Sequence, residues 1–246
     1  MARALYIHWP FCLAKCPYCD FNSHVRATHD DNAWQQALIA DMRHEAISIR
    51  SEEKLASIFF GGGTPSLMPP ALVAELLREA ERLWGFESDI EITLEANPSS
   101  VEAANFAALA AAGINRVSLG VQSLRDEALR FLGRLHGVDE ALKAVATAQA
   151  HFDRVSVDFI YARPKQTDAE WRTELSEALA LGTSHMSLYQ LTIEPATRFA
   201  TDVRRGIFDP LDNDRGGDLY ALTQEMTSAA GRPAYEISNH ARPGEE

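Results

Sequence analysis

Short apolar runs alternate with amphipathic helical patterns along nearly the whole chain of 246 residues. β-Branched and aromatic residues gather in six runs that predict strands, at residues 4–9, 57–60, 91–96, 116–121, 154–160 and 185–192. Patterns with the period of a helix follow these runs, over residues 31–49, 69–84, 101–112, 139–150, 168–181 and 212–230. A strand followed by a helix, six times over, predicts an α/β fold with parallel strands and right-handed crossovers. Six such units can form an open doubly wound sheet or a partial (β/α)6 TIM-like barrel.

The last segment, residues 233–246, starts like a further strand at Ala234 and breaks at Pro243 and Gly244. Its sequence is typical of an entry into a structure that continues past this chain. We therefore expect the barrel to occupy residues 1–232 and residues 233–246 to begin a truncated C-terminal segment.

Charge and composition exclude several classes of protein. The chain has 23 Lys and Arg against 35 Asp and Glu, a net charge of −12, whereas a protein that grips nucleic acid or an anionic membrane needs a basic face. With 46% hydrophobic and 24% charged residues, the chain is typical of globular rather than disordered proteins. We find no apolar run of about 18 residues that would predict a transmembrane segment, and the short, polar N-terminus does not match a secretory signal. We expect a cytoplasmic protein in a reducing environment.

All three cysteines lie in one short stretch, at Cys12, Cys16 and Cys19. Thiolates are soft ligands that select zinc, copper(I) or iron–sulfur clusters. Three interpretations are open: a dithiol redox pair at Cys16 and Cys19, a structural zinc site with His8 or His24 as fourth ligand, or a 4Fe–4S cluster. Three cysteines would leave one iron of such a cluster without a protein ligand and open to a substrate.

Other unusual residues fall where predicted strands end. They are a Gly61-Gly62-Gly63-Thr64 turn, Glu95, Gln122, Asp158, and a polar stretch that includes Tyr189, Gln190 and Glu194. Because the carboxyl ends of parallel strands carry the chemistry of α/β sheets and barrels, we expect one site there. The glycine turn lacks the pattern of a phosphate-binding loop. It is either a flexible turn or a place where a ligand approaches the backbone closely.

Two charged residues have both a structural and a functional interpretation. Arg134 lies in a loop, where its side chain is either solvated or binds a carboxylate through two hydrogen bonds. Asp158 stands in an otherwise apolar strand, and a buried carboxylate is costly unless it is paired or used.

The spacing Cys12-x-x-x-Cys16-x-x-Cys19, with an aromatic residue at Tyr18, resembles the signature of radical S-adenosylmethionine enzymes. Further segments resemble the branch that contains the oxygen-independent coproporphyrinogen III oxidases and the haem chaperones of the HemW group. These segments are residues 6–11, 60–66, 94–98, 118–123, 158–161, 187–195 and 235–239. The resemblance thus extends over almost the whole chain and implies a partial six-stranded barrel.

The resemblance also implies a role for each site residue. Cys12, Cys16 and Cys19 would ligate a 4Fe–4S cluster, whose open iron would be chelated by the amino and carboxylate groups of S-adenosylmethionine. The remaining contacts to the cofactors would come from Gly62, Gly63 and Thr64 at the methionine end, Arg134 at its carboxylate, Glu95, Gln122 and Asp158 at the nucleoside, Tyr6 and Tyr18 beside the cluster, and Leu191 at the adenine.

Two departures bear on the subfamily. The oxidases have a further cysteine where this chain has Phe21, and residues 189–195 also resemble the chaperones. The chaperones carry an H-N-x-x-Y-W haem motif in a C-terminal part that this chain does not include, so the resemblance implies haem binding only together with that part.

The main hypothesis is therefore a chaperone that delivers haem to an acceptor protein and needs an electron donor. The alternative is a coproporphyrinogen oxidase that uses a 5′-deoxyadenosyl radical to decarboxylate propionates. A zinc-stabilised α/β binding protein is the third possibility, so enzymatic activity stays open.

Overall fold

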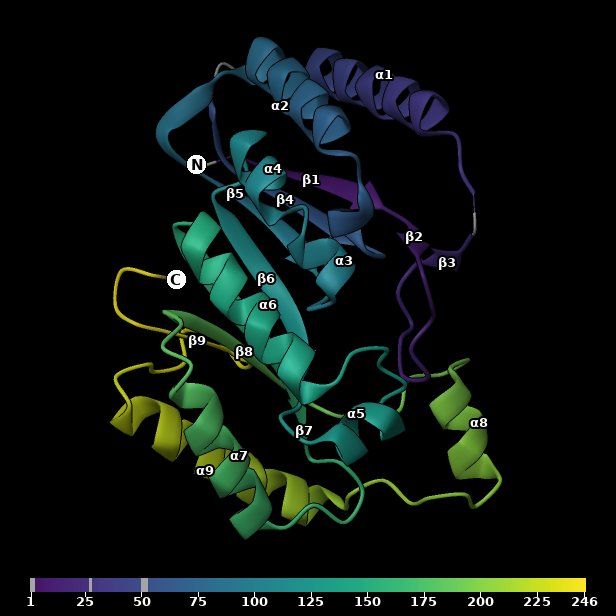
Figure 1. Ribbon diagram of the computed structural model, residues 1–246, viewed down its shortest axis with the longest axis vertical. Coiled ribbons are helices and arrows are strands. Elements are labelled where there is room, and N and C mark those ends of the chain that lie inside the picture. The colour runs from purple at the N-terminus through teal and green to yellow at the C-terminus, as the bar shows by residue number, and fades with distance from the viewer. Residues whose placement is uncertain (1–2, 27, 50–52) are drawn as a thin grey trace.

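The computed structural model describes residues 3–26, 28–49 and 53–246. Within these residues, the main sheet has seven strands in the order β1-β4-β5-β6-β7-β8-β9 (Figure 1). The first six are parallel: β1 (Arg3–Trp9), β4 (Leu55–Gly62), β5 (Phe86–Ala96), β6 (Arg116–Gln122), β7 (Arg154–Tyr161) and β8 (His185–Gln190). β9 (Asn239–Ala241) pairs antiparallel with β8. The α/β fold with parallel strands in chain order is thus confirmed, and the sixth predicted strand ends at Gln190 rather than at residue 192.

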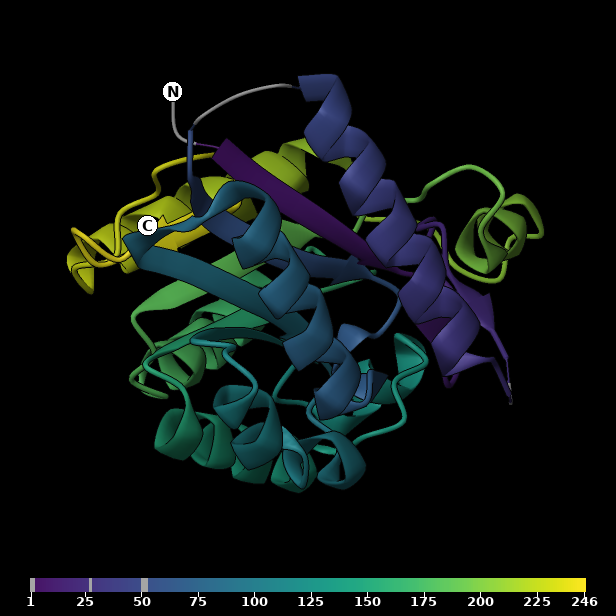
Figure 2. The same ribbon diagram turned by 90° about the horizontal axis from the view of Figure 1, so that it is seen from above.

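Helices surround the outer side of this curved sheet (Figure 2). The longer ones are α1 (Asp31–Ile49), α2 (Pro70–Trp84), α6 (Val138–His151), α7 (Asp168–Leu179) and α9 (Asn213–Ala229). Alternate strand residues such as Phe60 and Leu119 face the helices and are fully buried. Residues of opposite orientation, such as Ser118 and Asp158, line a cavity on the inner side. None of the helices in the described part of the chain has the length and apolar character that a bilayer crossing requires.

The prediction of one continuous helix over residues 101–112 is wrong. The structure divides it into α3 (Ser100–Ala103) and α4 (Phe106–Ala111). The Glu102 side chain turns into the protein and is only 1% exposed. The backbone N–H of Asn105 bonds to the Glu102 carbonyl at 2.9 Å, which closes a tight turn between the two short helices.

The strand expected to start at Ala234 is also wrong. Ala234 makes an isolated bridge to His240. The Glu236 carboxylate accepts hydrogen bonds from the backbone N–H groups of Ser238 and Asn239, both at 2.6 Å, and so stabilises a turn. The strand of this segment is β9, just after that turn. The division of the chain at residue 232 stays a prediction.

Shorter elements that the sequence did not suggest lie in the connections. They are β2 (Phe11–Cys12), β3 (His24–Val25), the 3-10 turn η1 (Pro65–Leu67), α5 (Asp126–Phe131) and α8 (Arg198–Arg204). Most of them are too short to show a recognisable hydrophobic period.

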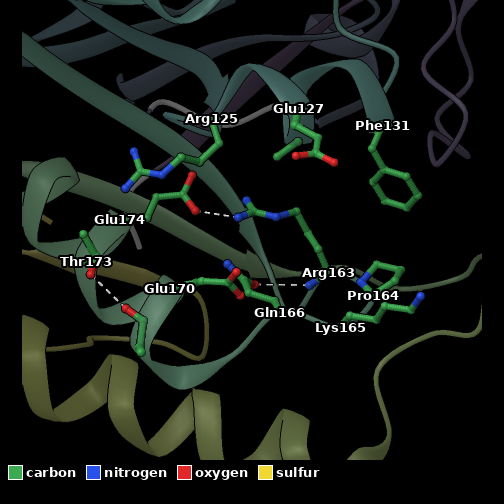
Figure 3. A pocket seen from close by; sticks show the side chains of 12 residues that line it. Arg125, Glu127, Phe131, Arg163, Pro164, Lys165, Gln166, Glu170, Thr173 and Glu174 are labelled. Carbon is green, nitrogen blue, oxygen red and sulfur yellow. Dashed lines mark hydrogen bonds and ion pairs between the residues drawn. The ribbon is translucent and has the colours of Figure 1, made fainter.

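Lys165, in the exposed turn between β7 and α7 (Figure 3), has a left-handed backbone with φ of 64°. Lys143 is equally exposed but lies inside α6. We expect Lys165→Gly to stabilise the protein by about 0.5 kcal/mol, since glycine adopts this conformation without steric cost. Lys143→Gly should destabilise it by about 1 kcal/mol because glycine is a poor helix former. Thermal unfolding of both variants shows whether stability changes in these opposite directions. A loss of stability in Lys165→Gly would contradict the inference that the left-handed backbone at Lys165 is strained.

Candidate functional site

The cysteines lie on a closed loop between β1 and α1. Its base is the short parallel pair β2 and β3, in which Cys12 stands opposite Val25. The Cys19 N–H donates to the Cys16 carbonyl at 3.1 Å, and the Lys15 ammonium donates to the Phe21 carbonyl at 3.1 Å. These bonds fold the loop so that the three thiols, all free and half-buried, line one cavity.

The thiols lie within electrostatic reach of one another. Burial raises the pKa of the Cys12 thiol above its ordinary value, and the neighbouring thiols of Cys19 and Cys16 raise it further. Hydrogen bonds with the hydroxyls of Thr64 and Ser23 oppose this shift. A cation or metal cluster that binds thiolates would remove this repulsion.

The two histidines considered as zinc ligands are both engaged. His8 shares a hydrogen bond with the Tyr6 hydroxyl at 2.9 Å through Nδ1 and with the Asn22 carbonyl at 2.9 Å through Nε2. His24 bonds to the Asn22 side chain at 3.2 Å. Among residues 3–26, 28–49 and 53–246, no three His, Cys, Asp or Glu side chains converge closely enough to hold a single metal ion. A 4Fe–4S cluster has a different requirement, because each thiolate binds a different iron.

The cavity has a volume of about 700 Å³ and lies at the carboxyl ends of the parallel strands. Every predicted site residue except Tyr6 lines it: Cys12, Cys16, Tyr18, Cys19, Gly62, Gly63, Thr64, Glu95, Gln122, Arg134, Asp158 and Leu191. Tyr6 lies outside the wall, stacked on Phe59 with ring centres 6.3 Å apart. The structure therefore brings together residues that are as far apart in the sequence as Cys12 and Leu191.

The glycine turn packs against the cysteine loop. A Cβ at Gly63 would fall 2.7 Å from the Phe11 carbonyl oxygen, and a Cβ at Gly62, where φ is 117°, would fall 2.6 Å from the His8 ring. The backbone N–H groups of Gly63 and Thr64 donate to the carbonyls of Trp9 and Phe11 at 2.6 and 2.9 Å. The turn is therefore held by close backbone contact, which neither the flexible-turn interpretation nor the ligand interpretation anticipated.

Two carboxylates face the cavity with pKa values near neutrality. Burial, and then the negative charge of Asp158, raise the pKa of Glu95 to about 7, while a hydrogen bond from the Gly62 N–H opposes the shift. Burial raises the pKa of Asp158 to about 6 against the hydrogen bonds from Ser118 and Ser187. Near pH 7 Glu95 is therefore partly protonated and can donate as well as accept hydrogen bonds, whereas Asp158 is mostly ionised and can accept them from the hydroxyl groups of a ligand.

Gln122 follows an irregularity in the pairing of β6 with β7. Its φ of 67° lies in the left-handed region, which is uncommon for a residue other than glycine. A Cβ at Gly120 would fall 2.7 Å from the Gln122 amide nitrogen and 3.2 Å from the Arg134 guanidinium, so the side chain turns back over Gly120. Backbone strain at a cavity wall is typical of functional sites.

Arg134 joins the cysteine loop to the strand ends. One of its terminal nitrogens donates to Cys16 Sγ at 3.4 Å and to the Tyr18 hydroxyl at 3.3 Å. The other donates to Asn97 Oδ1 at 2.5 Å and to the Gly120 carbonyl at 3.0 Å. Sequence reasoning missed the part of Asn97 in this site, although its place directly after the strand that carries Glu95 was a usable signal.

The fold and the cavity define an α/β protein of partial-barrel type with its site at the carboxyl edge of the sheet. The model of the Radical SAM superfamily matches residues 6–178, a stretch that contains all three cysteines. The chain therefore belongs to the radical SAM superfamily.

Individual relatives agree with this assignment. The heme chaperone HemW of Haemophilus influenzae is 42% identical over 98% of this chain and 63% of that protein. Radical S-adenosyl methionine domain-containing protein 1, mitochondrial, of Bos taurus is 39% identical over 98% of this chain and 54% of that protein. The coproporphyrinogen III oxidase HemN of Escherichia coli, a radical SAM enzyme, superposes with a TM-score of 0.84 at 26% identity, over 99% of this chain and 56% of that chain. The chain thus spans only 54 to 63% of the length of these proteins.

Membership in this superfamily implies a 4Fe–4S cluster and S-adenosylmethionine, and the residues present fit both. Three thiols in one loop are the soft donors that such a cluster needs. The cavity beside them has the size of a small-molecule site.

The glycine turn yields a test of the packing between the two loops. We expect Gly63→Ala to destabilise the protein by roughly 2–4 kcal/mol, since backbone cannot yield to the new Cβ. Gly217→Ala is the matched control. It lies inside α9 with nothing within 4 Å of the added Cβ, and it should stabilise by about 1 kcal/mol. Urea unfolding compares the two, and a neutral Gly63→Ala would contradict the close contact.

Asp158 yields a pH test. Its pKa is higher in the native protein, about 6, than the ordinary 3.8, so its contribution to stability falls as the pH rises from about 4 to about 6. Asp158→Asn should remove this pH-dependent loss of stability, because an amide does not titrate. Relative to the unchanged protein, we expect the variant to gain about 1–2 kcal/mol of unfolding free energy between pH 4 and pH 7.

The exposed Asp153→Asn is the control for this pH test, and it should show no such trend. Denaturant unfolding at both pH values measures the difference. A pH-independent difference for Asp158→Asn would contradict the raised pKa.

Proposed function

We propose that this chain is the S-adenosylmethionine-binding part of a haem chaperone of the HemW kind. The observation that carries the proposal is the convergence of the three thiols, the glycine turn and Arg134 on one cavity at the carboxyl edge of the sheet. Cys12, Cys16 and Cys19 would hold the 4Fe–4S cluster. When bound, the cluster and S-adenosylmethionine supply one-electron chemistry at the sulfonium, while the protein orients them and excludes water.

The other residues would hold S-adenosylmethionine. Gly62, Gly63 and Thr64 would line its methionine end, and Arg134 would meet the carboxylate as a cation close to Cys16. The remaining roles are Glu95, Gln122 and Asp158 at the nucleoside, Tyr6 and Tyr18 beside the cluster, and Leu191 at the adenine. The near-neutral pKa values of Glu95 and Asp158 support contacts with ribose hydroxyls, which are both donors and acceptors.

The charge of the cavity favours the chaperone over the oxidase. Among the described residues that line it, the cationic side chains are Lys15 and Arg134, against four acidic ones at Asp20, Glu95, Asp158 and Glu194. Lys15 is engaged in hydrogen bonds inside the protein, and Arg134 is the cation that the proposed function assigns to the carboxylate of S-adenosylmethionine. A porphyrinogen with several propionates would need free cations to bind these carboxylates. The higher identity to a heme chaperone, 42% against 26% for the oxidase, supports the same choice.

Haem binding and delivery are proposed only together with the part of the HemW relative that lies outside the match, because the chain spans 63% of that relative. A protein with both parts would have haem, a haem-accepting protein and an electron donor as partners. A reducing compartment such as the cytoplasm suits three clustered free thiols.

Anaerobic reconstitution with iron and sulfide tests the cluster. We expect about four irons and four sulfides per chain, with the broad visible absorbance of an iron–sulfur cluster. Cys16→Ala should lose this cluster, whereas Leu13→Ala, an exposed change in the same loop, should retain it. Stoichiometric zinc in a protein that takes up no iron would contradict the proposal.

A second measurement separates chaperone from oxidase. The reconstituted chain is incubated with a strong reductant, S-adenosylmethionine and coproporphyrinogen III, and the porphyrinogens are separated by chromatography. We expect no decarboxylated product, because the cavity lacks free cations for the propionates. Formation of protoporphyrinogen at catalytic turnover would instead establish the oxidase.

A further inference from the structure

Asn97, directly after β5, contacts three parts of the site. Its side-chain nitrogen donates to Thr64 Oγ1 at 3.2 Å, and its side-chain oxygen accepts from Arg134 at 2.5 Å. Its backbone N–H donates to the Glu102 carboxylate at 2.7 Å. Asn97 therefore links the glycine turn to the arginine that contacts Cys16.

Glu102 fixes the position of Asn97 through the hydrogen bond that it accepts from the Asn97 backbone N–H. This carboxylate is 1% exposed and also accepts a short hydrogen bond from Ser66 in η1 and one from Ser99 at 3.2 Å. Burial raises the pKa of Glu102, and the hydrogen bonds from Ser66 and Asn97 oppose the shift. The buried Glu102 carboxylate needs these three hydrogen bonds, because a buried charge without partners is costly. It therefore holds the three donor groups firmly in place.

The hydrogen bonds of Arg134 show why its orientation matters. A guanidinium has five N–H donors in a fixed plane. Four of them are used: two on Asn97 and the Gly120 carbonyl, and two on Cys16 Sγ and the Tyr18 hydroxyl. Because the group is planar, the bonds to Asn97 and Gly120 fix the direction of the edge that faces Cys16.

We infer that Asn97, held by Glu102, is a positioning residue that directs Arg134 onto the sulfur of Cys16. This inference rests on the proposed function, in which Cys16 is a cluster ligand. A hydrogen bond to a ligand sulfur stabilises the more negative, reduced cluster and raises its reduction potential. The same orientation keeps a cation in place for the carboxylate of S-adenosylmethionine.

The test uses the reconstituted chain and two variants of Asn97. Asn97→Ala removes the acceptor for Arg134, and Asn97→Asp keeps it. Redox titration followed by electron paramagnetic resonance measures the cluster potential, and equilibrium dialysis measures S-adenosylmethionine affinity. For Asn97→Ala we expect a more negative potential and about tenfold weaker binding, the order of effect expected when a residue that orients a contacting side chain is lost. Asn97→Asp should retain the S-adenosylmethionine affinity near that of the unchanged chain; its potential is not compared, because the added negative charge by itself lowers it.

Glu102→Gln tests the support of Asn97 without changing a contact to Arg134. It should move the potential and the affinity in the same direction as Asn97→Ala. The matched control is Glu174→Gln, another carboxylate at 1% exposure, which accepts from Ser123 and Leu124 and pairs with Arg163 at a different pocket (Figure 3). The control should lower the melting temperature and leave the potential and the affinity unchanged.

The outcomes are distinct. If Asn97→Ala loses thermal stability but keeps the potential and the affinity of the unchanged chain, Asn97 is only structural and the inference is overturned. If Asn97→Ala does not assemble a cluster, an unchanged potential and affinity in Glu102→Gln overturn it equally. If the unchanged chain itself takes up no cluster, the proposed function fails, and the inference fails with it.

Discussion

The site depends on one close contact, between the glycine turn after β4 and the chain that leads from β1 into the cysteine loop. The Gly63 and Thr64 N–H groups donate to the Trp9 and Phe11 carbonyls at 2.6 and 2.9 Å. Side chains at the glycines would collide with these same segments. Two loops that leave neighbouring parallel strands are thereby held as one unit, and Cys12 is placed within hydrogen-bond reach of Thr64.

A second constraint is the polar inner side of the sheet. Small or polar residues such as Ser118 and Gly120 leave space for a cavity, while the opposite face of the same strands packs against the helices. The carboxylates of Glu95 and Asp158 stand in this cavity at a cost to native stability that develops as the pH rises from about 4 toward 7. Native proteins accept such a cost where a ligand uses the groups.

Sequence and structure agree where an element is recorded in the local apolar pattern, and they differ where it is not. Strands and long helices were predictable, since a helix such as α2 depends on an apolar period contained within its own residues. The break between α3 and α4 was not predicted, because the apolar pattern over residues 101–112 does not record the turn that the Asn105 N–H closes on the Glu102 carbonyl. The strand expected at Ala234 forms later in the chain, as β9. Its position depends on pairing with β8 and on the turn at Glu236, rather than on the apolar run at Ala234.

By itself, the sequence determined the parallel α/β architecture, because period and strand order place strand ends at one edge. Strand ends together with the family resemblance also named many, but not all, of the residues that line the cavity. Tertiary structure alone decided how these residues are held. Arg134 and Cys16 lie 118 residues apart, and Arg134 and Asn97 lie 37 apart. It also placed Tyr6 outside the cavity wall and engaged both nitrogens of His8. Hydrogen-bond partners between distant segments follow from the relative placement of packed elements, which no local pattern records.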